Sequence, residues 1–358
     1  MNAPFRPSTI TIRSARLDQA DERTWIERFV AGHGDGTPFH RPAWIESVAR
    51  GTGNRAAALL AEREGQLVGW LPLVDVSSPI FGRALVSSGF AVGGGVLALD
   101  ETGRNALLDA VVAEAARLSC PAIELRGGAM PEALPDWTVR SDSHCGFVRP
   151  LEENDEAQLT AIPRKQRAEV RKSLANDLTV DVGSGAADRA AHYAVYAESV
   201  RNLGTPVFPR RLFAEVLDAF GDDADILTVR HQGKPVASVL SLYHAGAVMP
   251  YWGGGTRDAR RLRANDRMYY ELMLHARRRG CDRFDFGRSK TGSGAHDFKR
   301  NWGFQPQPLH YATWTAPGAK GRDTDPTSDG HSAKIELWKR LPLPVANLIG
   351  PWIARGLG

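Results

Sequence analysis

Hydrophobic and polar residues follow a pattern typical of a mixed α/β domain in the first half of the chain. Residues 56–62 and 67–76 are two apolar runs separated by a charged, glycine-containing turn, which predicts a β-hairpin. A strand is expected over 84–95, ending in three glycines, and a helix with an apolar stripe up to Leu118 follows it. Residues 120–126 form the last expected strand of this half. Before the hairpin we expect one strand and two helices, at 9–13, from Asp21 and over 42–50.

The second half repeats this order. Residues 225–243 predict another hairpin, whose turn residue Gly233 lies 233 − 65 = 168 positions after Gly65. A strand at 248–255 again ends in three glycines, and a helix at 265–280 and a strand from Cys281 follow. Two copies of one order predict two copies of one α/β (α+β) domain. Antiparallel strands followed by a strand–helix–strand unit are the order of GNAT-type N-acyltransferases, in which a splayed central strand receives the acyl donor.

We therefore expect tandem GNAT-like domains, each a mixed, largely antiparallel sheet flanked by helices. The predicted boundaries are an N-terminal domain at 1–150, a catalytic domain at 151–314, a linker at 315–334 and an amphipathic extension at 335–358. The extension is interrupted by prolines. Two interpretations remain open for it: docking back on the domain, or anchoring at a membrane interface.

The composition of the chain limits the classes of protein to which it can belong. The 358 residues contain 42% hydrophobic and 24% charged residues and carry a net charge of only +4, so any basic function must be a local patch. Three cysteines without CxxC spacing predict neither a disulfide framework nor a metal site. The N-terminus lacks the apolar core of a signal peptide, and no run reaches the length of a membrane span. We expect a cytoplasmic protein that is soluble or peripheral to the inner membrane face.

A basic helix is predicted at 162–174. Arg164, Arg167 and Arg171 have i, i+3 and i+7 spacing and would form one stripe. The stripe is either a solvated face or a contact for phosphate groups of a nucleic acid or a nucleotide-linked substrate. Further along, Arg201 and Asn202 precede a turn at Gly204 and are weaker candidates for ligand contacts.

Residues 248–304 hold most of the candidate chemistry. Tyr251 and Trp252 precede three glycines, which suit either close approach to a ligand or a tight turn. An arginine run follows, and Asn265 or Asp266 is expected to cap the next helix. A CoA-binding acetyltransferase carries its pyrophosphate loop here, but arginine stands where the loop needs glycine. CoA is therefore disfavoured as the donor.

Charged residues emerge at the end of the last strand of the second copy. Asp285 lies between two phenylalanines and is expected to point away from them, and Arg288 and Lys290 follow. Residues 292–294 predict a mobile loop that leads to Lys299. Acyl transfer then needs a proton acceptor, either Asp285 or a tyrosine (Tyr251 or Tyr269), and a cation (Lys299 or Arg288) that stabilises the oxyanion. The first copy, residues 120–128, is expected to lack counterparts of these groups.

Four segments, 162–174, 201–209, 250–273 and 284–304, together resemble FemAB-related proteins associated with exosortase/PEP-CTERM systems, a branch of the Fem-type aminoacyltransferases. The resemblance extends over the whole chain. It implies transfer of an aminoacyl group from tRNA to an amine of a cell-envelope or exopolysaccharide precursor. It also implies that Lys299, in the sequence DFKRNWGF, lies at the acyl-transfer centre. The long coiled-coil arm of some Fem enzymes is absent, which weakens the case for tRNA.

The resulting hypothesis is an acyltransferase without a bound cofactor, in which aminoacyl-tRNA or, second, acyl-CoA is a co-substrate. Its catalytic candidates are Lys299, Asp285, Tyr251 and Arg288. Its substrate-binding candidates are Trp252, Gly253, Gly254, Tyr269, Asn265, Arg201, Asn202, Lys290, Ser289, Trp302, Arg164, Arg167 and Arg171. Two alternatives remain: an acyl-CoA-dependent GNAT acetyltransferase, and a non-catalytic scaffold at a membrane face.

Overall fold

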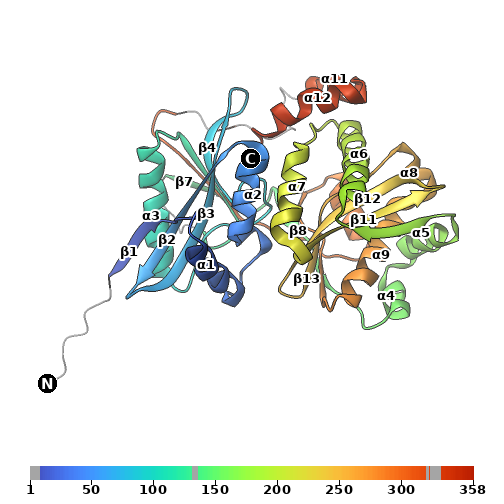
Figure 1. The fold of residues 1–358 in the computed structure, drawn as a ribbon, viewed down its shortest axis with the longest axis horizontal. Helices are drawn as coiled ribbons and strands as arrows, with labels where there is room; N and C mark the ends of the chain where they lie inside the picture. The colour runs from blue at the N-terminus through green and yellow to red at the C-terminus, as the bar shows by residue number, and fades with distance from the viewer. Residues whose placement is uncertain (1–8, 131–135, 320–321, 323–331) are drawn as a thin grey trace. The chain divides into compact units, whose positions relative to one another are not determined.

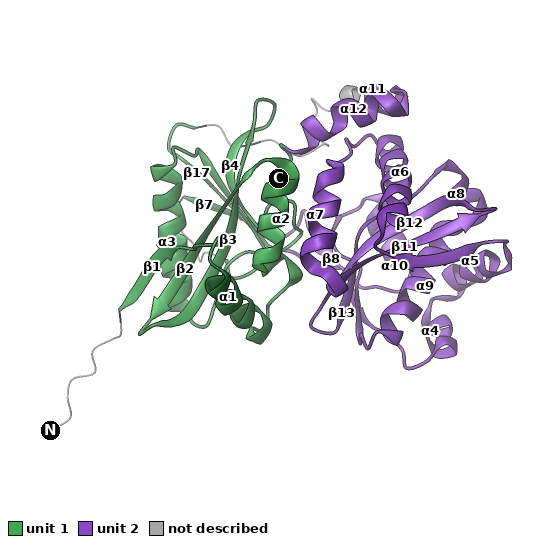
Figure 2. Cartoon of the chain, in the orientation of Figure 1, with its two compact units in different colours: residues 1–140, 310–323, 356–358 green, residues 141–309, 324–355 purple. Residues whose placement is uncertain are grey.

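The computed structural model describes residues 9–130, 136–319, 322 and 332–358. The chain forms two compact units (Figure 1, Figure 2). Unit 1 comprises residues 1–140, 310–323 and 356–358, and unit 2 comprises 141–309 and 324–355. Each unit has its own mixed and largely antiparallel sheet flanked by helices, which confirms the predicted fold class.

Unit 1 is built on a sheet of order β1-β2-β3-β4-β6-β17-β7, with β5 paired to β3. Helix α3 packs its apolar stripe on one face, where Leu107 and Val111 join Val68 and Leu71 in the core. On α2, Trp44 is fully buried. The bounds are β1 (Ile10–Ser14), α1 (Ala20–Gly32), a short 3-10 helix (Pro38–His40), α2 (Pro42–Thr52), β2 (Arg55–Arg63), β3 (Gln66–Ser78), β4 (Gly82–Ser87), β5 (Leu97–Ala98), α3 (Glu101–Arg117), β6 (Ala122–Arg126), β7 (Trp137–Arg140) and β17 (Tyr311–Thr315).

Unit 2 is built on a sheet of order β10-β11-β12-β13-β14-β9, and a small second sheet has the order β15-β8-β16. The strands are β8 (His144–Gly146), β9 (Val148–Pro150), β10 (Thr179–Gly183), β11 (Ala224–His231), β12 (Lys234–His244), β13 (Ala247–Gly255), β14 (Arg283–Asp285), β15 (Ser289–Lys290) and β16 (Gln307–Pro308). The helices are α4 (Asp155–Ala161), α5 (Arg164–Ala175), α6 (Ala186–Leu203), α7 (Arg210–Phe220), a 3-10 turn (Gly221–Asp223), α8 (Arg257–Leu262), α9 (Ala264–Arg278), α10 (Gly294–Asn301), α11 (Ser332–Arg340) and α12 (Leu343–Ala354).

Helices cover both faces of the unit 2 sheet. On α6, His192 Nδ1 lies 3.0 Å from Ser238 Oγ of β12. The next residue of β12, Val239, joins the core formed with Met268 of α9. Since successive side chains of a strand point to opposite faces, α6 and α9 lie on opposite sides of the sheet.

The repeat is confirmed in the backbone. Gly65 and Gly233 have φ of 75° and 77°, and the residues before them, Glu64 and Gln232, are also in the left-handed region. This is the backbone that two-residue hairpin turns need. The β-bulge at Ala61/Glu62 recurs at Val229/Arg230, again 168 positions later (229 − 61). Each copy also has a short parallel pairing, β4 with β6 and β13 with β14.

Two local predictions differ from the structure. The strand expected over 84–95 ends at Ser87, because Ser88 has a φ of 47° and its buried hydroxyl donates to the carbonyls of Phe39 and Gly94. All three glycines, residues 93–95, therefore follow the strand in a loop. In the second copy the arginine run forms α8, and α9 already begins at Ala264. Its N-cap is Arg263, in left-handed conformation, and not Asn265 or Asp266, the two alternatives that the sequence suggests.

Two strands join the sheets out of sequence order. β9 (148–150) pairs with β14 in unit 2, and β17 (311–315) pairs with β6 in unit 1. The boundary expected at 150 places β9 in the N-terminal domain, and the boundary expected at 314 places most of β17 in the catalytic domain. Most of the linker expected at 315–334 lies outside the described residues.

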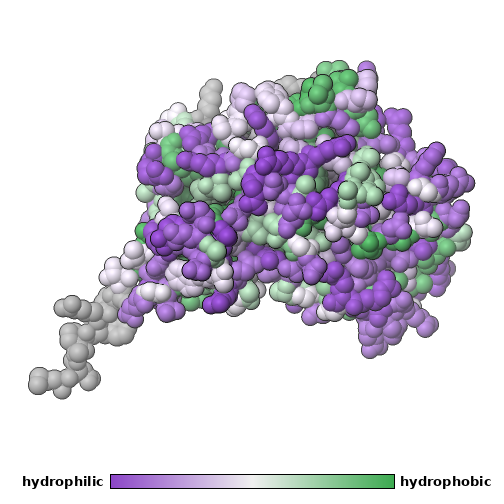
Figure 3. Space-filling view, viewed as in Figure 1, coloured by the Kyte–Doolittle hydropathy of each residue, from purple (hydrophilic) through white to green (hydrophobic). Residues whose placement is uncertain are grey.

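The C-terminal extension forms α11 and α12, which contact α6 of unit 2. Hydrophobic side chains gather on the outside over these two helices (Figure 3). None of the helices in the described part of the chain is long and apolar enough to cross a membrane.

Candidate active site in unit 2

The site is organised by the divergence of β13 from β14. The two strands pair only at Ala247/Arg283 and Val248/Phe284 in the described structure. Beyond these pairs Asp285 ends β14, and its Oδ1 accepts a hydrogen bond of 2.8 Å from the Gly287 amide. Phe284 and Phe286 are buried in the core on the α9 side, so Asp285 points away from them as predicted.

Lys299 reaches the same strand end from α10. This helix is capped by Ser293, whose hydroxyl accepts from the His296 amide, so the glycine-spaced loop at 292–294 leads directly into it. The Lys299 ammonium donates to the carbonyls of Gly287 (3.2 Å) and Arg288 (2.8 Å). An ammonium has three donors, so one remains for a ligand.

Two aromatic rings enclose the ammonium. Lys299 Nζ lies 5.4 Å from the ring centroid of Phe147 and 5.5 Å from that of Phe286, within the range of cation–π contacts. The side chain is buried, with only 9% of the residue exposed. This environment removes water from the cation and holds it in one position.

Burial changes the charges of this site. Desolvation lowers the pKa of Lys299 to about 7; nearby Asp285 opposes that shift and Arg288 adds to it. Desolvation also raises the pKa of Asp285, against the Gly287 hydrogen bond and the Lys299 charge. Both groups therefore change protonation closer to neutral pH than an exposed aspartate or lysine. Such a pair is typical of functional sites.

Aromatic residues form a wall next to this pair. Tyr269 of α9 stacks edge-on against Phe286, with 4.7 Å between centroids, and also packs near Trp302. Burial raises the pKa of Tyr269 to about 12, so its phenol stays protonated at neutral pH. Trp302 Nε1 and Ser289 Oγ are buried polar atoms without a hydrogen-bond partner in the described structure.

Of the predicted residues on β13, Gly253 lies near this cluster, since a side chain there would come within 3.5 Å of the Tyr269 hydroxyl. Trp252 is buried against Phe213 of α7 (4.8 Å between centroids), and Tyr251 lies edge-on to Trp252 at the bulge of β13. A side chain at Gly253 would meet Val239, and one at Gly254 would meet Ser199. These two glycines therefore allow close packing of the sheet against its own neighbours.

The remaining predicted contacts are distributed over unit 2. Asn265 lies in the first turn of α9, and its buried Oδ1 has no partner within the described residues. Arg201 donates to the carbonyl of Lys339 on α11, and Asn202 follows it at the end of α6. Arg288 is half-buried beside Lys299, and Lys290 lies in β15.

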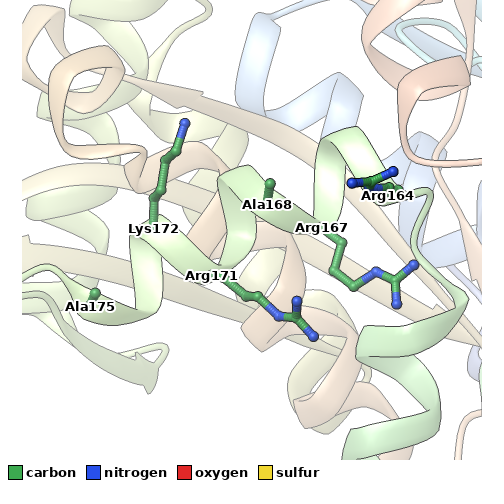
Figure 4. Close-up of a pocket in the computed structure, with 6 residues that line it drawn as sticks. All are labelled: Arg164, Arg167, Ala168, Arg171, Lys172 and Ala175. Carbon is green, nitrogen blue, oxygen red and sulfur yellow. The ribbon is translucent and has the colours of Figure 1, made fainter.

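The predicted basic stripe is present on α5. Gln166, Val170 and Ser173 form the buried face of the helix. Arg164, Arg167 and Arg171 line an open hollow of about 620 Å³ on its other side. Figure 4 shows Arg167 and Arg171 extending to the same side of α5, away from Lys172. No guanidinium of the three arginines makes a hydrogen bond or ion pair among the residues that the structure describes.

The start of α5 lies beside the end of α10. A side chain at Gly303 would approach Pro163, the residue before the first arginine, to 3.1 Å. Gln166 donates to Asp266 of α9 (2.6 Å), and Glu169 pairs with Arg263 (2.8 Å). These contacts fix the basic helix to the two helices that carry Tyr269 and Lys299.

Sequence reasoning missed part of the site. Phe147 comes 152 positions before Lys299 (299 − 147), in the segment between β8 and β9, and no local pattern marks it. The carbonyls of Gly287 and Arg288 carry no side-chain signal at all. The glycine at 287 is the signal that the sequence offers at this point, because its left-handed φ of 66° is a conformation that favours glycine. No group of His, Cys, Asp or Glu in the described chain is arranged to hold a metal ion.

Comparisons with known proteins agree with this architecture. Residues 163–300, all in unit 2, match the acetyltransferase (GNAT) domain family. The fold is that of GNAT-type acyltransferases arranged in tandem. No curated protein matches the sequence.

Three solved structures illustrate the likeness. FemX is 16% identical, with a TM-score of 0.62 over 81% of this chain and 95% of its own. The C-terminal domain of a putative lysylphosphatidylglycerol synthetase from Agrobacterium fabrum is 16% identical, with a TM-score of 0.54 over 82% and 92%. A tandem GNAT protein from the clavulanic acid biosynthesis pathway is 10% identical, with a TM-score of 0.56 over 87% and 100%. At these identities the likeness concerns the fold.

Proposed function

We propose that this chain transfers an aminoacyl or acyl group to an amine, and that the reaction takes place beside Lys299 in unit 2. One observation carries the proposal: a buried ammonium, fixed by two backbone carbonyls, lies beside a carboxylate where β13 and β14 have diverged. This arrangement supplies a cation and a proton acceptor in a site with little water, which acyl transfer requires.

In the proposed reaction, the amine nitrogen of the acceptor attacks the carbonyl carbon of the donor. A C–N bond forms, and the carbonyl electrons move to oxygen, where the remaining N–H of Lys299 stabilises the oxyanion. Asp285 accepts the proton of the amine. The intermediate then expels the donor's oxygen or sulfur, which takes up a proton as it leaves.

We propose aminoacyl-tRNA as the donor. Support comes from Arg164, Arg167 and Arg171 on α5, whose guanidinium groups have no partner among the described residues and whose charge suits a phosphate backbone. Their helix starts beside the end of α10. The region where a CoA enzyme holds pyrophosphate contains the extra helix α8 and the left-handed Arg263 instead. The match to the acetyltransferase domain favours acyl-CoA as the second candidate donor.

For the acceptor we propose an amine of a cell-envelope or exopolysaccharide precursor. The support is the resemblance of four segments of the sequence to FemAB-related proteins, including the DFKRNWGF segment that contains Lys299. Arg288 and Lys290, at the end of β14 and in β15, are proposed to contact a phosphate or carboxylate of this acceptor, and Ser289 and Trp302 to contribute polar contacts.

The test is a transfer assay with each donor class. The purified protein is incubated with bulk aminoacyl-tRNA or with acetyl-CoA and an amine acceptor, and the mass of the product is measured. We expect an aminoacyl product that disappears in Lys299→Ala and in the unbranched variant Lys299→Met, but persists in Lys234→Met, which changes an exposed lysine of the second hairpin. An acetyl product would establish the CoA enzyme instead, and full turnover by both Lys299 variants would refute the proposed site.

A further inference from the structure

The last helix of the chain is docked by its small residues. Ala346, Gly350 and Ala354 have i, i+4 and i+8 spacing and are the buried residues of α12. A side chain at Gly350 would approach the backbone of Val207 to 3.1 Å, so glycine permits this close packing. Arg201 secures α11 through its hydrogen bond to the carbonyl of Lys339. The helix is therefore held against unit 2 with its small side chains inward.

The large apolar residues of α12 point outward. Val345, Leu348, Ile349 and Trp352 follow i, i+3, i+4 and i+7 spacing, and Leu348 is 80% and Trp352 51% exposed. Leu337 of α11 adds to the same group at 66%. Figure 3 shows the hydrophobic cluster over these two helices. We call Leu337, Val345, Leu348, Ile349 and Trp352 the outer apolar face.

This orientation is the reverse of a normal surface helix. An amphipathic helix of a globular protein places its large apolar residues in the core and its charged residues in water. The segment Leu343–Ala354 contains no charged residue at all, so it has no polar face to offer to water. A contiguous exposed apolar group of this kind marks a contact with another apolar phase.

The charges around this face favour a lipid surface over a second copy of the chain. Lys339, whose ammonium pairs with Glu336 (2.7 Å), and Arg340 precede α12, and Arg355 follows it, while residues 341–358 contain no Asp or Glu. Because Glu336 already pairs with Lys339, self-association through this face would bring Arg340 and Arg355 of each copy near cations of the other. Anionic lipid headgroups would instead be attracted to both ends of the helix, and Trp352 suits the boundary between headgroups and acyl chains.

We infer that the outer apolar face of α11 and α12 binds the surface of a bilayer that contains anionic phospholipid. The helices lie in the plane of the interface, with the large apolar side chains in the headgroup and acyl boundary and the cations among the phosphates. This inference does not depend on the proposed transfer reaction, because it rests on a different part of unit 2.

The test is co-flotation of the full chain with vesicles of phosphatidylcholine, with and without phosphatidylglycerol. We expect the protein to float with the anionic vesicles and less at high salt. Leu348→Glu should reduce the bound fraction about tenfold or more, because it places a carboxylate in the acyl boundary. As its side chain is largely exposed, its thermal unfolding should match that of the wild type. Leu99→Glu, a matched change of a leucine that is 62% exposed in unit 1, should bind like the wild type.

Three outcomes would overturn the inference. The wild-type chain could fail to float with anionic vesicles. Leu348→Glu and Leu99→Glu could bind equally well. Light scattering could show a dimer that Leu348→Glu dissociates, without any vesicle binding, in which case a second copy of the chain covers this face.

Discussion

The same strand position carries an acidic residue in both copies of the repeat, but in opposite surroundings. Glu124 of β6 lies between the core residues Ile123 and Leu125, as Asp285 of β14 lies between Phe284 and Phe286. Glu124 accepts ion pairs from Arg126 (3.1 Å) and Arg322 (3.2 Å). Asp285 instead accepts one backbone amide, and its nearby cation is a lysine with a lowered pKa.

This comparison corrects one expectation, namely that residues 120–128 lack a counterpart of Asp285. Glu124 is that counterpart, 161 positions earlier (285 − 124), and what the first copy lacks is the buried lysine. The ion pairs with Arg126 and Arg322 occupy the carboxylate of Glu124 with structural contacts. The difference between the copies is therefore one of partners, and the acidic residue itself is shared.

The neighbouring strand differs as well. In the first copy β4 stops at Ser87, and Trp44 Nε1 donates to the carbonyls of Ser88 (2.9 Å) and Gly89 (3.1 Å), which fixes the loop that follows. In the second copy β13 continues to Gly255 while β14 diverges from it. The first copy thus uses its polar groups for internal bonds, and the second leaves an ammonium donor and a carboxylate available.

The largest expected effect comes from neutralising the acidic residue of each copy in a separate variant. Asp285→Asn should lower kcat/KM for transfer by about 10²–10⁴, since it removes the proposed proton acceptor while keeping the size of the side chain. Glu124→Gln should leave kcat/KM unchanged, because this carboxylate is proposed to serve only its two arginines. Steady-state kinetics of both purified variants, with circular dichroism to confirm folding, measure the difference.

The unfolding free energy of Glu124→Gln is the control in this experiment. Glu124→Gln leaves the guanidinium groups of Arg126 and Arg322 with weaker partners and should cost roughly 1–3 kcal/mol of unfolding free energy. The proposed division of roles between the copies would be wrong if Glu124→Gln reduced transfer as strongly as Asp285→Asn in folded protein.

The pH dependence of transfer sharpens the same comparison. In the proposed reaction, Asp285 must be deprotonated to accept a proton, and its raised pKa moves the acidic limb of the profile above the range of an exposed aspartate. Lys299 must be protonated for its proposed role in stabilising the oxyanion, so activity should fall as pH rises through about 7. We expect a bell-shaped profile of log kcat/KM, with each limb approaching tenfold per pH unit.

Lys299→Arg tests the assignment of the alkaline limb. Arginine stays charged far above neutral pH, so the fall near pH 7 should disappear even where the altered geometry lowers the maximal rate. If the alkaline limb stayed at the same pH in Lys299→Arg, another group would be responsible for it.

Much of the fold was predictable because local signals agreed with it. The two hairpin turns, the apolar stripe of α3 and the helix α7 with its buried Leu212 and Phe213 follow directly from sequence periodicity and turn glycines. The short strands β9 and β17 were not predictable in their pairing. They are 3 and 5 residues long and pair with strands far away in the sequence, which no local pattern encodes.

The candidate site likewise has residues that the sequence identifies and residues whose role it leaves ambiguous. Lys299, Asp285, Tyr269 and Trp302 were all identified from the sequence, and the structure brings them to one strand end. The glycines after Trp252 were ambiguous, because glycine permits close approach of either a ligand or the protein's own side chains. Here Ser199, Val239 and the Tyr269 hydroxyl border that space.

The smallest effect tests the repeat itself. Gly65 and Gly233 have nearly equal left-handed φ, and an added methyl group would meet no atom within 4 Å at either position. Alanine at either position should therefore lower the free energy of unfolding by about 1–2 kcal/mol, the cost of a left-handed backbone for a residue with a Cβ. We expect the same loss in both copies. Urea unfolding of Gly65→Ala and Gly233→Ala measures it, with Gly32→Ala as the matched control. Gly32 also has open space around it but lacks a positive φ, so its alanine variant should lose no stability. Unequal costs at Gly65 and Gly233 would mean that the two hairpins, although they share turn and bulge, do not contribute alike to the stability of their units.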